Sequence, residues 1–326
     1  LIAVWLYHYG LGHRWQLGTV LVLWLGVGVA SNAAGPRGFI GNAASSATSN
    51  GQQELAVTFL DVGHGTSVVI ELPDGRVWLY DAGHLGASPR SHQGIAAALW
   101  EMQVCRVDRL ILSHADSDHY NAVQGLLERF WISRVASTSE FWRSKDPPVS
   151  ELIGHLRAAE IPMETWDASS KGKAAEVGWE VLHPETDSTS ESDNASSLCL
   201  LLSYAGRRVL LPGDLDGTGL LRLTHLPARP CHVLMAPHHG SLSRDPTHLL
   251  RWCQPELVVI SGNHQAIRPA VVRKYQPWTR QLGITFRDGA VQHRIAADSR
   301  VSTWHWLDSS WNQLVTSTRG PEHEEL

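Results

Sequence analysis

The chain has 326 residues, of which 43% are hydrophobic and 18% charged, and this balance fits a globular chain and argues against a wholly disordered one. The net charge of −5 is opposite in sign to the basic surface of most nucleic-acid-binding proteins, although bound metal ions would add local positive charge. The cysteines are widely spaced and include no Cys-x-x-Cys pair, so we expect small apolar core residues rather than a zinc ribbon or a disulfide framework. They are Cys105, Cys199, Cys231 and Cys253.

The beginning of the chain is strongly apolar. Residues 1–7 read LIAVWLY, and residues 17–30 read LGTVLVLWLGVGVA without a charge. The second run is shorter than the roughly 20 residues that span a bilayer. Trp15 could act as an interfacial anchor, and residues 1–30 are therefore predicted to form a transmembrane segment at the end of a longer membrane domain. Two alternatives stay open. A signal peptide would fit Arg14, the apolar run and the small residues after it, and a buried core helix would fit the apolar run alone.

A change in composition follows the apolar segment. Residues 31–53 are rich in Ser, Ala, Gly and Asn, which predicts a flexible linker. A folded domain is expected over residues 54–295. Residues 296–326 are expected to form a C-terminal extension that ends in a frayed tail.

Short apolar runs alternate with helical segments in this domain. Helices are expected at 95–104 and at about 122–130, and the turn residues at 73–75 predict a hairpin between two strands. Strand pairs with interspersed helices predict mixed sheets covered by helices, an α/β or α+β fold class. The expected strands are residues 55–60, 67–72, 76–80, 107–112, 198–204, 208–211, 233–235 and 257–260.

The clearest chemical signature is the run H-A-D-S-D-H at residues 114–119, directly after an apolar strand. In an extended loop alternate side chains point the same way, so His114, Asp116 and Asp118 are expected to face one cavity. His119 opens the next helix and approaches that cavity from another direction. Two imidazoles and two carboxylates within six residues suit divalent ions. A solvated loop with a helix-capping Asp would need only one acidic residue, so a metal site is favoured.

Four further motifs lie at the ends of strands or between them. Asp214 follows Gly213 at the end of one strand, and P-H-H-G-S at 237–241 follows another. The run D-V-G-H-G-T at 61–66 joins two strands, and its glycines permit close approach of the backbone to a ligand. Asp81, in D-A-G, is suited to orient a metal-bound histidine. Each pattern alone is also ordinary turn or core chemistry, but three strands that each end in ligand-type residues favour a metal site.

In chain order, the motifs D-x-G-x-G, D-A-G, H-x-D-x-D-H, G-D and H-H-G-S resemble those of the metallo-β-lactamase superfamily, most closely the branch found in ComEC-like DNA-uptake proteins. The resemblance covers about residues 54–295. It implies an αββα sandwich with a two-metal site at its edge. The apolar segment at 1–30 fits the last membrane helix of such a protein. The run H-x-D-x-D-H together with P-H-H-G-S is specific, whereas D-A-G alone is not.

The resemblance also implies roles for individual residues. It implies two divalent ions, zinc or manganese, as cofactors of a two-metal hydrolysis. Asp118, His239 and His64 are implied as catalytic groups, the two histidines as proton donors to the leaving oxygen. Support behind the ligands is expected from Asp61, Asp81 and Asn194. The implied metal ligands are His114, Asp116, Asp118, His119, Asp214, which bridges the two ions, and His238, with His239 as its neighbour or substitute.

Several positions depart from the family pattern. Asp116 stands where the superfamily often has a second histidine, which makes one site harder and favours manganese over zinc. The superfamily's third-motif histidine has no match, and Asn194 lies in the corresponding stretch. ComEC-like chains usually have Gln and Asp at the positions of His64 and Thr66, and His-Pro at 268–269.

Three functions stay open. The resemblance favours a phosphodiesterase or nuclease on the extracytoplasmic side of the bacterial inner membrane. Such an enzyme would degrade the non-transported DNA strand during natural transformation, with single-stranded DNA as substrate and other competence proteins and the membrane as partners. A degenerate or structural metal-binding module of a DNA channel would bind metal without turnover. A secreted hydrolase of another ester or lactam would cleave nitrocefin or a thioester, although H-x-D-x-D-H differs from the H-x-H-x-D of true β-lactamases.

Overall fold

The chain divides into two units, Leu1–Gly51 and Gln52–Leu326. The membrane segment predicted at residues 1–30 lies outside the described residues, as does nearly all of the linker predicted at 31–53. No helix in the described ranges is long and apolar enough to cross a bilayer. The computed structural model describes residues 53–86, 91–186, 192–243 and 245–314.

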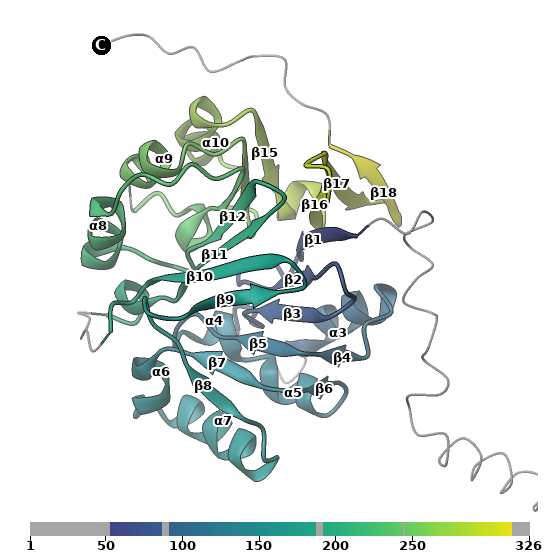
Figure 1. Ribbon diagram of the computed structural model, residues 1–326, viewed down its shortest axis with the longest axis vertical. Helices are drawn as coiled ribbons and strands as arrows, with labels where there is room; N and C mark the ends of the chain where they lie inside the picture. The colour runs from purple at the N-terminus through teal and green to yellow at the C-terminus, as the bar shows by residue number, and fades with distance from the viewer. Residues whose placement is uncertain (1–52, 87–90, 187–191, 244, 315–326) are drawn as a thin grey trace, which may run out of the picture. The chain divides into compact units, whose positions relative to one another are not determined.

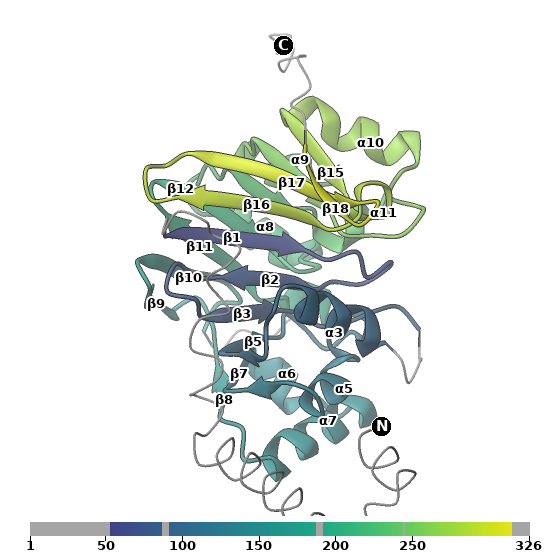
Figure 2. The same ribbon diagram turned by 90° about the vertical axis from the view of Figure 1, so that its right-hand side faces the viewer.

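Two β-sheets lie face to face in the second unit (Figure 1). Figure 2 shows the strands of the larger sheet one above another, from β17 to β8. In spatial order, this nine-stranded sheet contains β18 (Ser310–Gln313), β17 (Val301–Leu307), β16 (Val291–Ala296), β1 (Glu54–Phe59), β2 (Val68–Glu71), β3 (Val77–Tyr80), β5 (Arg109–Ile111), β7 (Val135–Ser137) and β8 (Met163–Thr165). The seven-stranded sheet contains β15 (Gln281–Ile284), β14 (Leu257–Ile260), β13 (Val233–Met235), β12 (Arg207–Leu211), β11 (Cys199–Tyr204), β10 (Val177–His183) and β9 (Lys171–Ala174).

Helices cover the outer face of each sheet. On the larger sheet lie α3 (His92–Glu101), α5 (Val123–Leu127) and α7 (Pro147–Ala158), and on the smaller sheet lie α8 (Gly217–His225), α9 (Thr247–Cys253) and α10 (Pro269–Tyr275). The four-layer α/β sandwich expected from the sequence is therefore confirmed. The remaining elements are β4 (Arg106–Val107) with its partner β6 (Trp131–Ile132), α4 (Ser117–Tyr120), α6 (Ser139–Arg143), α11 (Thr285–Asp288), η2 (Asn194–Ser196), η3 (Pro237–Gly240) and η4 (Gln276–Trp278).

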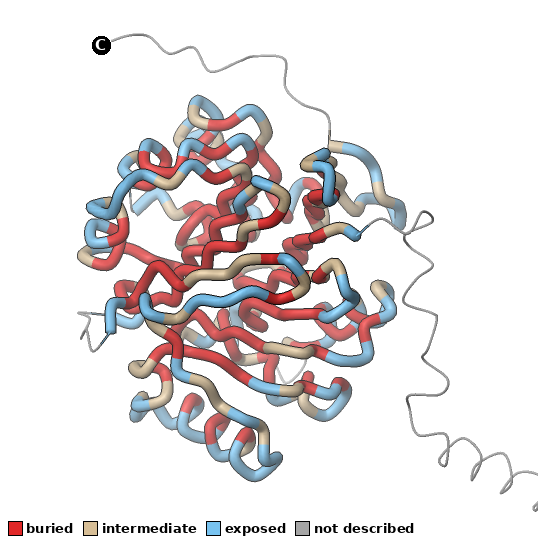
Figure 3. Tube along the Cα trace, in the orientation of Figure 1, coloured by how far each residue is buried: buried red, intermediate tan, exposed pale blue. Residues whose placement is uncertain are grey.

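The core between the sheets is built from alternate residues of facing strands. Leu55, Val57 and Phe59 of β1 have no exposed surface and belong to one cluster with Leu200 and Leu202 of β11. Because successive side chains of a strand point to opposite faces, this spacing of two buries one face of each sheet against the other. Figure 3 shows the result, with buried strands at the centre and exposed residues mainly on helices and connecting loops.

Several sequence expectations need correction. The apolar run at 107–112 is not one strand, because Asp108 turns its carboxylate to the backbone N–H of Val77 and separates β4 from β5. The sheet also continues past residue 295, through β17 and β18. Three cysteines are buried as expected, but Cys105 is exposed before β4.

Candidate metal centre

The motif residues follow strands that run parallel within their sheets. In the larger sheet β3 pairs in parallel with β5, and in the smaller sheet β12 pairs in parallel with β13. Asp81 follows β3, His114 follows β5 by two residues, Asp214 follows β12, and His239 lies in η3 after β13. Parallel strands end at the same edge of a sheet, which is where α/β proteins build their sites. The two sheets therefore bring side chains from distant parts of the sequence to one place.

One group of ligand-type side chains is completely buried. One ring nitrogen each of His114 and His119 and one carboxylate oxygen of Asp214 lie within 4.8 Å of one another. The Nε2 of His119 is 3.4 Å from Oδ1 of Asp214, and the centroids of the two imidazole rings are 4.1 Å apart. Two imidazoles and one carboxylate at this spacing form a suitable partial shell for a divalent ion.

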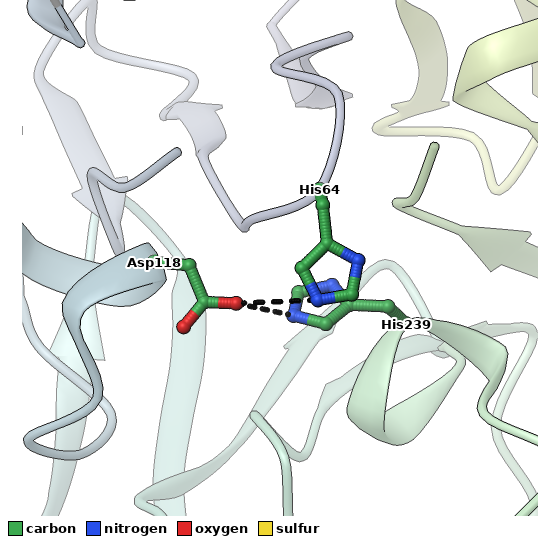
Figure 4. Close-up of side chains that lie close together, drawn as sticks. All are labelled: His64, Asp118 and His239. Atoms are coloured by element: carbon green, nitrogen blue, oxygen red, sulfur yellow. Dashed lines mark ion pairs between the residues drawn. The ribbon is translucent and has the colours of Figure 1, made fainter. Parts of the chain in front are cut away.

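A second group lies beside the first and nearer the surface. His64, Asp118 and His239 also offer three atoms within 4.8 Å of one another. Figure 4 shows both imidazoles directed at the same carboxylate oxygen of Asp118; the distances are 3.5 Å from Nε2 of His64 and 3.3 Å from Nε2 of His239. The Oδ2 atom of Asp214 is 3.5 Å from Nε2 of His239, so the Asp214 carboxylate contacts both groups. This position is suitable for a carboxylate that bridges two ions.

Unpaired nitrogen atoms point into the centre. The Nε2 atoms of His114, His119 and His239 are buried and have no hydrogen-bond partner within the described part of the chain. Buried polar atoms without a partner are costly, and they are rare unless a ligand, an ion or a water satisfies them. The donor set of imidazole nitrogens and carboxylates matches divalent transition metals. The residues present therefore fit the divalent metal binding that the sequence predicted.

The other ring nitrogen of these three histidines, Nδ1, makes a hydrogen bond on the side away from the centre. The Nδ1 atom of His119 is 2.8 Å from Oδ2 of Asp81, and that of His239 is 2.9 Å from the carbonyl oxygen of Ser261. Because these oxygens accept hydrogen bonds, each Nδ1 keeps its proton, and the Nε2 lone pair faces the centre when the ring is neutral, the form that binds a metal. Ser113 donates its hydroxyl to Asp81 and lies 2.9 Å from Nδ1 of His114, which it holds in the same way.

The charges of the centre stabilise one another. Burial would raise the pKa of Asp214, but the neighbouring His239 and His119 hold it well below its ordinary value. Burial would likewise raise the pKa of Asp118, but its close contact with His239 and the charge of His119 lower it. Burial would lower the pKa of His119, yet Asp214 and Asp81 raise it well above the ordinary value. The metal-free centre therefore favours ionised carboxylates beside protonated imidazoles, and metal binding must displace those protons.

The backbone at the centre is strained at several residues. Asp81, His238 and His239 have φ angles of 56°, 52° and 53°, a left-handed region that L-residues with side chains rarely adopt. Such strain persists only where surrounding contacts fix the conformation, and it is common at functional sites. Here it turns the chain sharply after β3 and β13, so that His239 points into the centre and Asp81 points at His119 and Ser113 behind it.

Besides Asp81, four residues predicted from the sequence lie outside the two groups. Asp116 is partly exposed, with Oδ2 3.4 Å from Nε2 of His114. His238 is also partly exposed, with Nδ1 3.5 Å from Oδ2 of Asp214. The side chain of Asn194 approaches His238, since its Nδ2 is 3.4 Å from Nδ1. Asp61 accepts a hydrogen bond from the backbone of Gly63 and so shapes the loop between β1 and β2.

Two supporting residues were not found from the sequence. Ser113 directly precedes the H-A-D-S-D-H run, and that position is the only signal for its role. Ser261 supports His239 through its backbone carbonyl oxygen, which every residue type carries. The sequence therefore contains no signal for the role of Ser261.

A sequence model described as the metallo-beta-lactamase superfamily matches residues 60–249, more than half of the chain and all six side chains of the two groups. The chain belongs to the metallo-beta-lactamase superfamily. Among solved structures, the metallo-beta-lactamase fold protein YhfI from Bacillus subtilis is similar, with a TM-score of 0.50 and 9% identity over 73% of this chain and 99% of that one. At this identity the likeness concerns the fold alone.

Two curated competence proteins are related to this chain in sequence. ComE operon protein 3 of Bacillus subtilis is 25% identical over 269 residues, which cover 77% of this chain and 34% of that protein. Competence protein ComA of Neisseria gonorrhoeae is 29% identical over 267 residues, which cover 78% of this chain and 35% of that protein. The resemblance to ComEC-like proteins is thereby confirmed. The chain spans about a third of the length of these relatives.

Proposed function

We propose that residues 53–314 form a metal-dependent phosphodiesterase that cuts single-stranded DNA. In this proposal the substrate is the strand that a ComEC-like protein does not transport during natural transformation. The observation that carries it is the convergence of three unpaired imidazole nitrogens with the carboxylates of Asp118 and Asp214. The similarity to two competence proteins supports DNA as the substrate class.

When bound, two divalent ions supply Lewis-acid chemistry, because they lower the pKa of a water nucleophile and polarise the phosphoryl group. The protein's part is to place and orient the ligands. Asp214 offers one carboxylate oxygen to each group, and Asp81 and Ser261 fix the rings of His119 and His239. The partly exposed Asp118 and His64 lie on the open side of the centre, where a DNA backbone would approach.

The test is cleavage of labelled single-stranded DNA by the full chain after chelation and reloading with Mn²⁺, Zn²⁺ or Mg²⁺. We expect cutting that depends on the added metal and no turnover of nitrocefin or a thioester. Asp214→Asn should abolish cutting, because it removes the charge shared by both groups, while the exposed control His248→Ala should cut normally. Two bound ions without DNA cleavage would instead indicate a structural metal module, and nitrocefin turnover would indicate a hydrolase of another substrate class.

We also propose that residues 1–30 anchor the protein in the inner membrane, with the hydrolase domain on the extracytoplasmic side and other competence proteins as partners. The support is the pair of apolar runs at 1–7 and 17–30. A cysteine introduced within residues 31–50 should react with a membrane-impermeant thiol reagent added to the outside of whole cells or spheroplasts. Labelling only after the cytoplasm is opened would overturn this orientation.

A further inference from the structure

We infer that His64 is a metal ligand and that it completes, with Asp118 and His239, a site of two imidazoles and one carboxylate. The sequence suggested a different role for His64, protonation of the leaving oxygen. The inference rests on the proposed metal-dependent function. It concerns metal binding itself, however, so it can stand or fall separately from DNA cleavage.

The first support is the direction of the His64 ring. Its Nε2 atom is 3.5 Å from Oδ2 of Asp118, the same oxygen that lies 3.3 Å from Nε2 of His239, and the two ring centroids are 4.4 Å apart. A carboxylate oxygen with two imidazole nitrogens directed at it is the arrangement of a ligand shell that surrounds one ion. A proton donor would need its nitrogen directed at the substrate instead.

The second support is that the backbone around His64 is fixed. The N–H of Leu85 donates to the carbonyl oxygen of His64, and the N–H of Thr66 donates to that of Asp118 at 3.1 Å. A Cβ atom at Gly65 would lie 2.6 Å from the carbonyl oxygen of Gly83 and 2.9 Å from that of Asp118. The loop between β1 and β2 is therefore packed, backbone against backbone, on the segment that carries Asp118. His64 is preorganised at this position and does not need to swing in from solvent.

The third support is a residue shared by two ligands. Ser261, which follows β14, accepts a hydrogen bond from Nδ1 of His239 with its carbonyl oxygen and donates its hydroxyl to the carbonyl oxygen of Gly65 at 2.9 Å. Ser261 thus fixes both the orientation of the His239 ring and the position of the backbone next to His64. Metal ligands are commonly held by such hydrogen bonds from behind, whereas an independent proton donor would not require a shared support.

The assignment has a consequence for metal preference. Imidazole suits zinc, cobalt and nickel, and carboxylates suit harder ions such as magnesium and manganese. With His64 the second site offers two imidazole nitrogens beside the carboxylates of Asp118 and Asp214. Without His64 the same carboxylates remain with one imidazole, that of His239, so the preference of the site for zinc or cobalt over magnesium should weaken.

The experiment is a Co²⁺ and Zn²⁺ titration of the metal-stripped full chain in wild-type, His64→Ala and His64→Gln forms, with the exposed His248→Ala as control. Bound metal is counted by elemental analysis, affinity is measured against a chelating dye, and Co²⁺ coordination is followed by its visible absorption. We expect two ions in the wild type and in the control. Both His64 variants should bind the second ion at least about 10-fold more weakly and change the Co²⁺ spectrum.

The melting temperature of each metal-free form shows whether the fold is intact, and His64→Gln keeps the size of the side chain should His64→Ala misfold. Wild-type affinity and an unchanged Co²⁺ spectrum in a folded His64→Gln variant would overturn the inference. If that variant then cuts DNA slowly, His64 acts on the substrate. If the variant loses the second ion but the wild type cuts no DNA, the ligand assignment stands and the proposed function fails.

Discussion

Asp81 holds the centre together from a position with no exposed surface. Its carboxylate accepts hydrogen bonds from the backbone N–H and the hydroxyl of Ser113, both at 2.7 Å, and from His119. Asp81→Asn keeps the size of the side chain and tolerates the left-handed backbone, but it removes the charge that fixes the His119 ring. We expect metal affinity to fall on the order of 10–100-fold, measured by chelator competition.

A matched substitution separates this effect from a general loss of charge. Asp74→Asn changes an exposed turn carboxylate that pairs with Arg76, and it should leave metal affinity unchanged. Asp81→Ala should bind metal as weakly as Asp81→Asn and also melt lower, because alanine disfavours a φ of 56° by roughly 1–2 kcal/mol. Equal metal affinity in Asp81→Asn and the wild type would show that His119 is oriented by other groups.

His293 is a polar residue on the core face of β16. It lies between Val291 and Ile295, and its Nδ1 is 3.0 Å from the hydroxyl of Thr303. Burial, and then the charges of His232 and Arg207, lower the pKa of His293 to about 4. The unfolded chain, with an ordinary pKa near 6.5, therefore takes up this proton first as the pH falls.

The free energy of unfolding therefore keeps its full value above pH 6.5 as far as His293 is concerned. It decreases as the pH falls toward about 4, by an amount on the order of 3 kcal/mol. His293→Gln keeps a hydrogen-bonding side chain but cannot take up the proton. Urea unfolding of the chelated protein between pH 7 and pH 4 should therefore show a shallower decline for this variant than for the wild type. The exposed control His248→Gln should follow the wild type. Parallel curves for His293→Gln and the wild type would mean that another group causes the acid sensitivity.

At the scale of elements, the short helix α4 carries Asp118 and His119 and lies against the turn after β3. A Cβ atom at Gly83 would lie only 2.0 Å from the backbone carbonyl carbon of Asp118. Gly83→Ala should therefore displace α4, lower the free energy of unfolding by about 1–3 kcal/mol and weaken metal binding. Gly94→Ala is the control, because a Cβ there would meet no atom of the described chain within 4 Å. In helix α3 that change should be neutral or stabilising by up to about 1 kcal/mol.

The elements that the sequence predicted well are those with continuous apolar character. The strands at 233–235 and 257–260 are confirmed at their expected bounds, since β13 and β14 are buried along their whole length. Strands β9 and β17 were not predicted, because they are edge or near-edge strands with many exposed residues and no clear alternation. Helix α3 begins at His92, before the expected position, since polar residues of its first turn carry no apolar signal.

The candidate site was also predicted only in part from the sequence. Ligand-type residues placed directly after strands were visible in the sequence, as Asp214 and His114 illustrate. The grouping of His64 with Asp118 depends on how one loop packs on another, through contacts made by backbone atoms and glycines. Tertiary contacts of this kind leave no pattern in local sequence. The sequence therefore indicated the chemistry of the centre but not the partners of each ligand.

At the scale of the whole molecule, we predict that residues 52–326 fold without residues 1–51. The described strands and helices belong to the second unit, and so do the residues of its core clusters that the structure describes. A chain of residues 52–326 should unfold cooperatively in urea, with a melting temperature equal to that of the full chain. A chain of residues 52–299 should be less stable, because it lacks β17 and exposes the edge of β16 and the buried His293. Equal stability of the two shortened chains would show that β17 and β18 are dispensable.

The proposed metal ligands follow strands of both sheets, so a bound ion would link one sheet to the other. His119 and Asp214 are 95 positions apart (214 − 119), and Asp118 and His239 are 121 apart (239 − 118). In the unfolded chain these side chains are far apart, so an ion that needs both binds the folded state alone and stabilises it by mass action, by roughly 2.7 kcal/mol at a free concentration about 100 times its dissociation constant. On the proposed function, the supply of the ion would then affect the stability of the folded domain as well as its chemistry. A shortage of the ion would favour unfolding and proteolysis of the domain in addition to stopping catalysis.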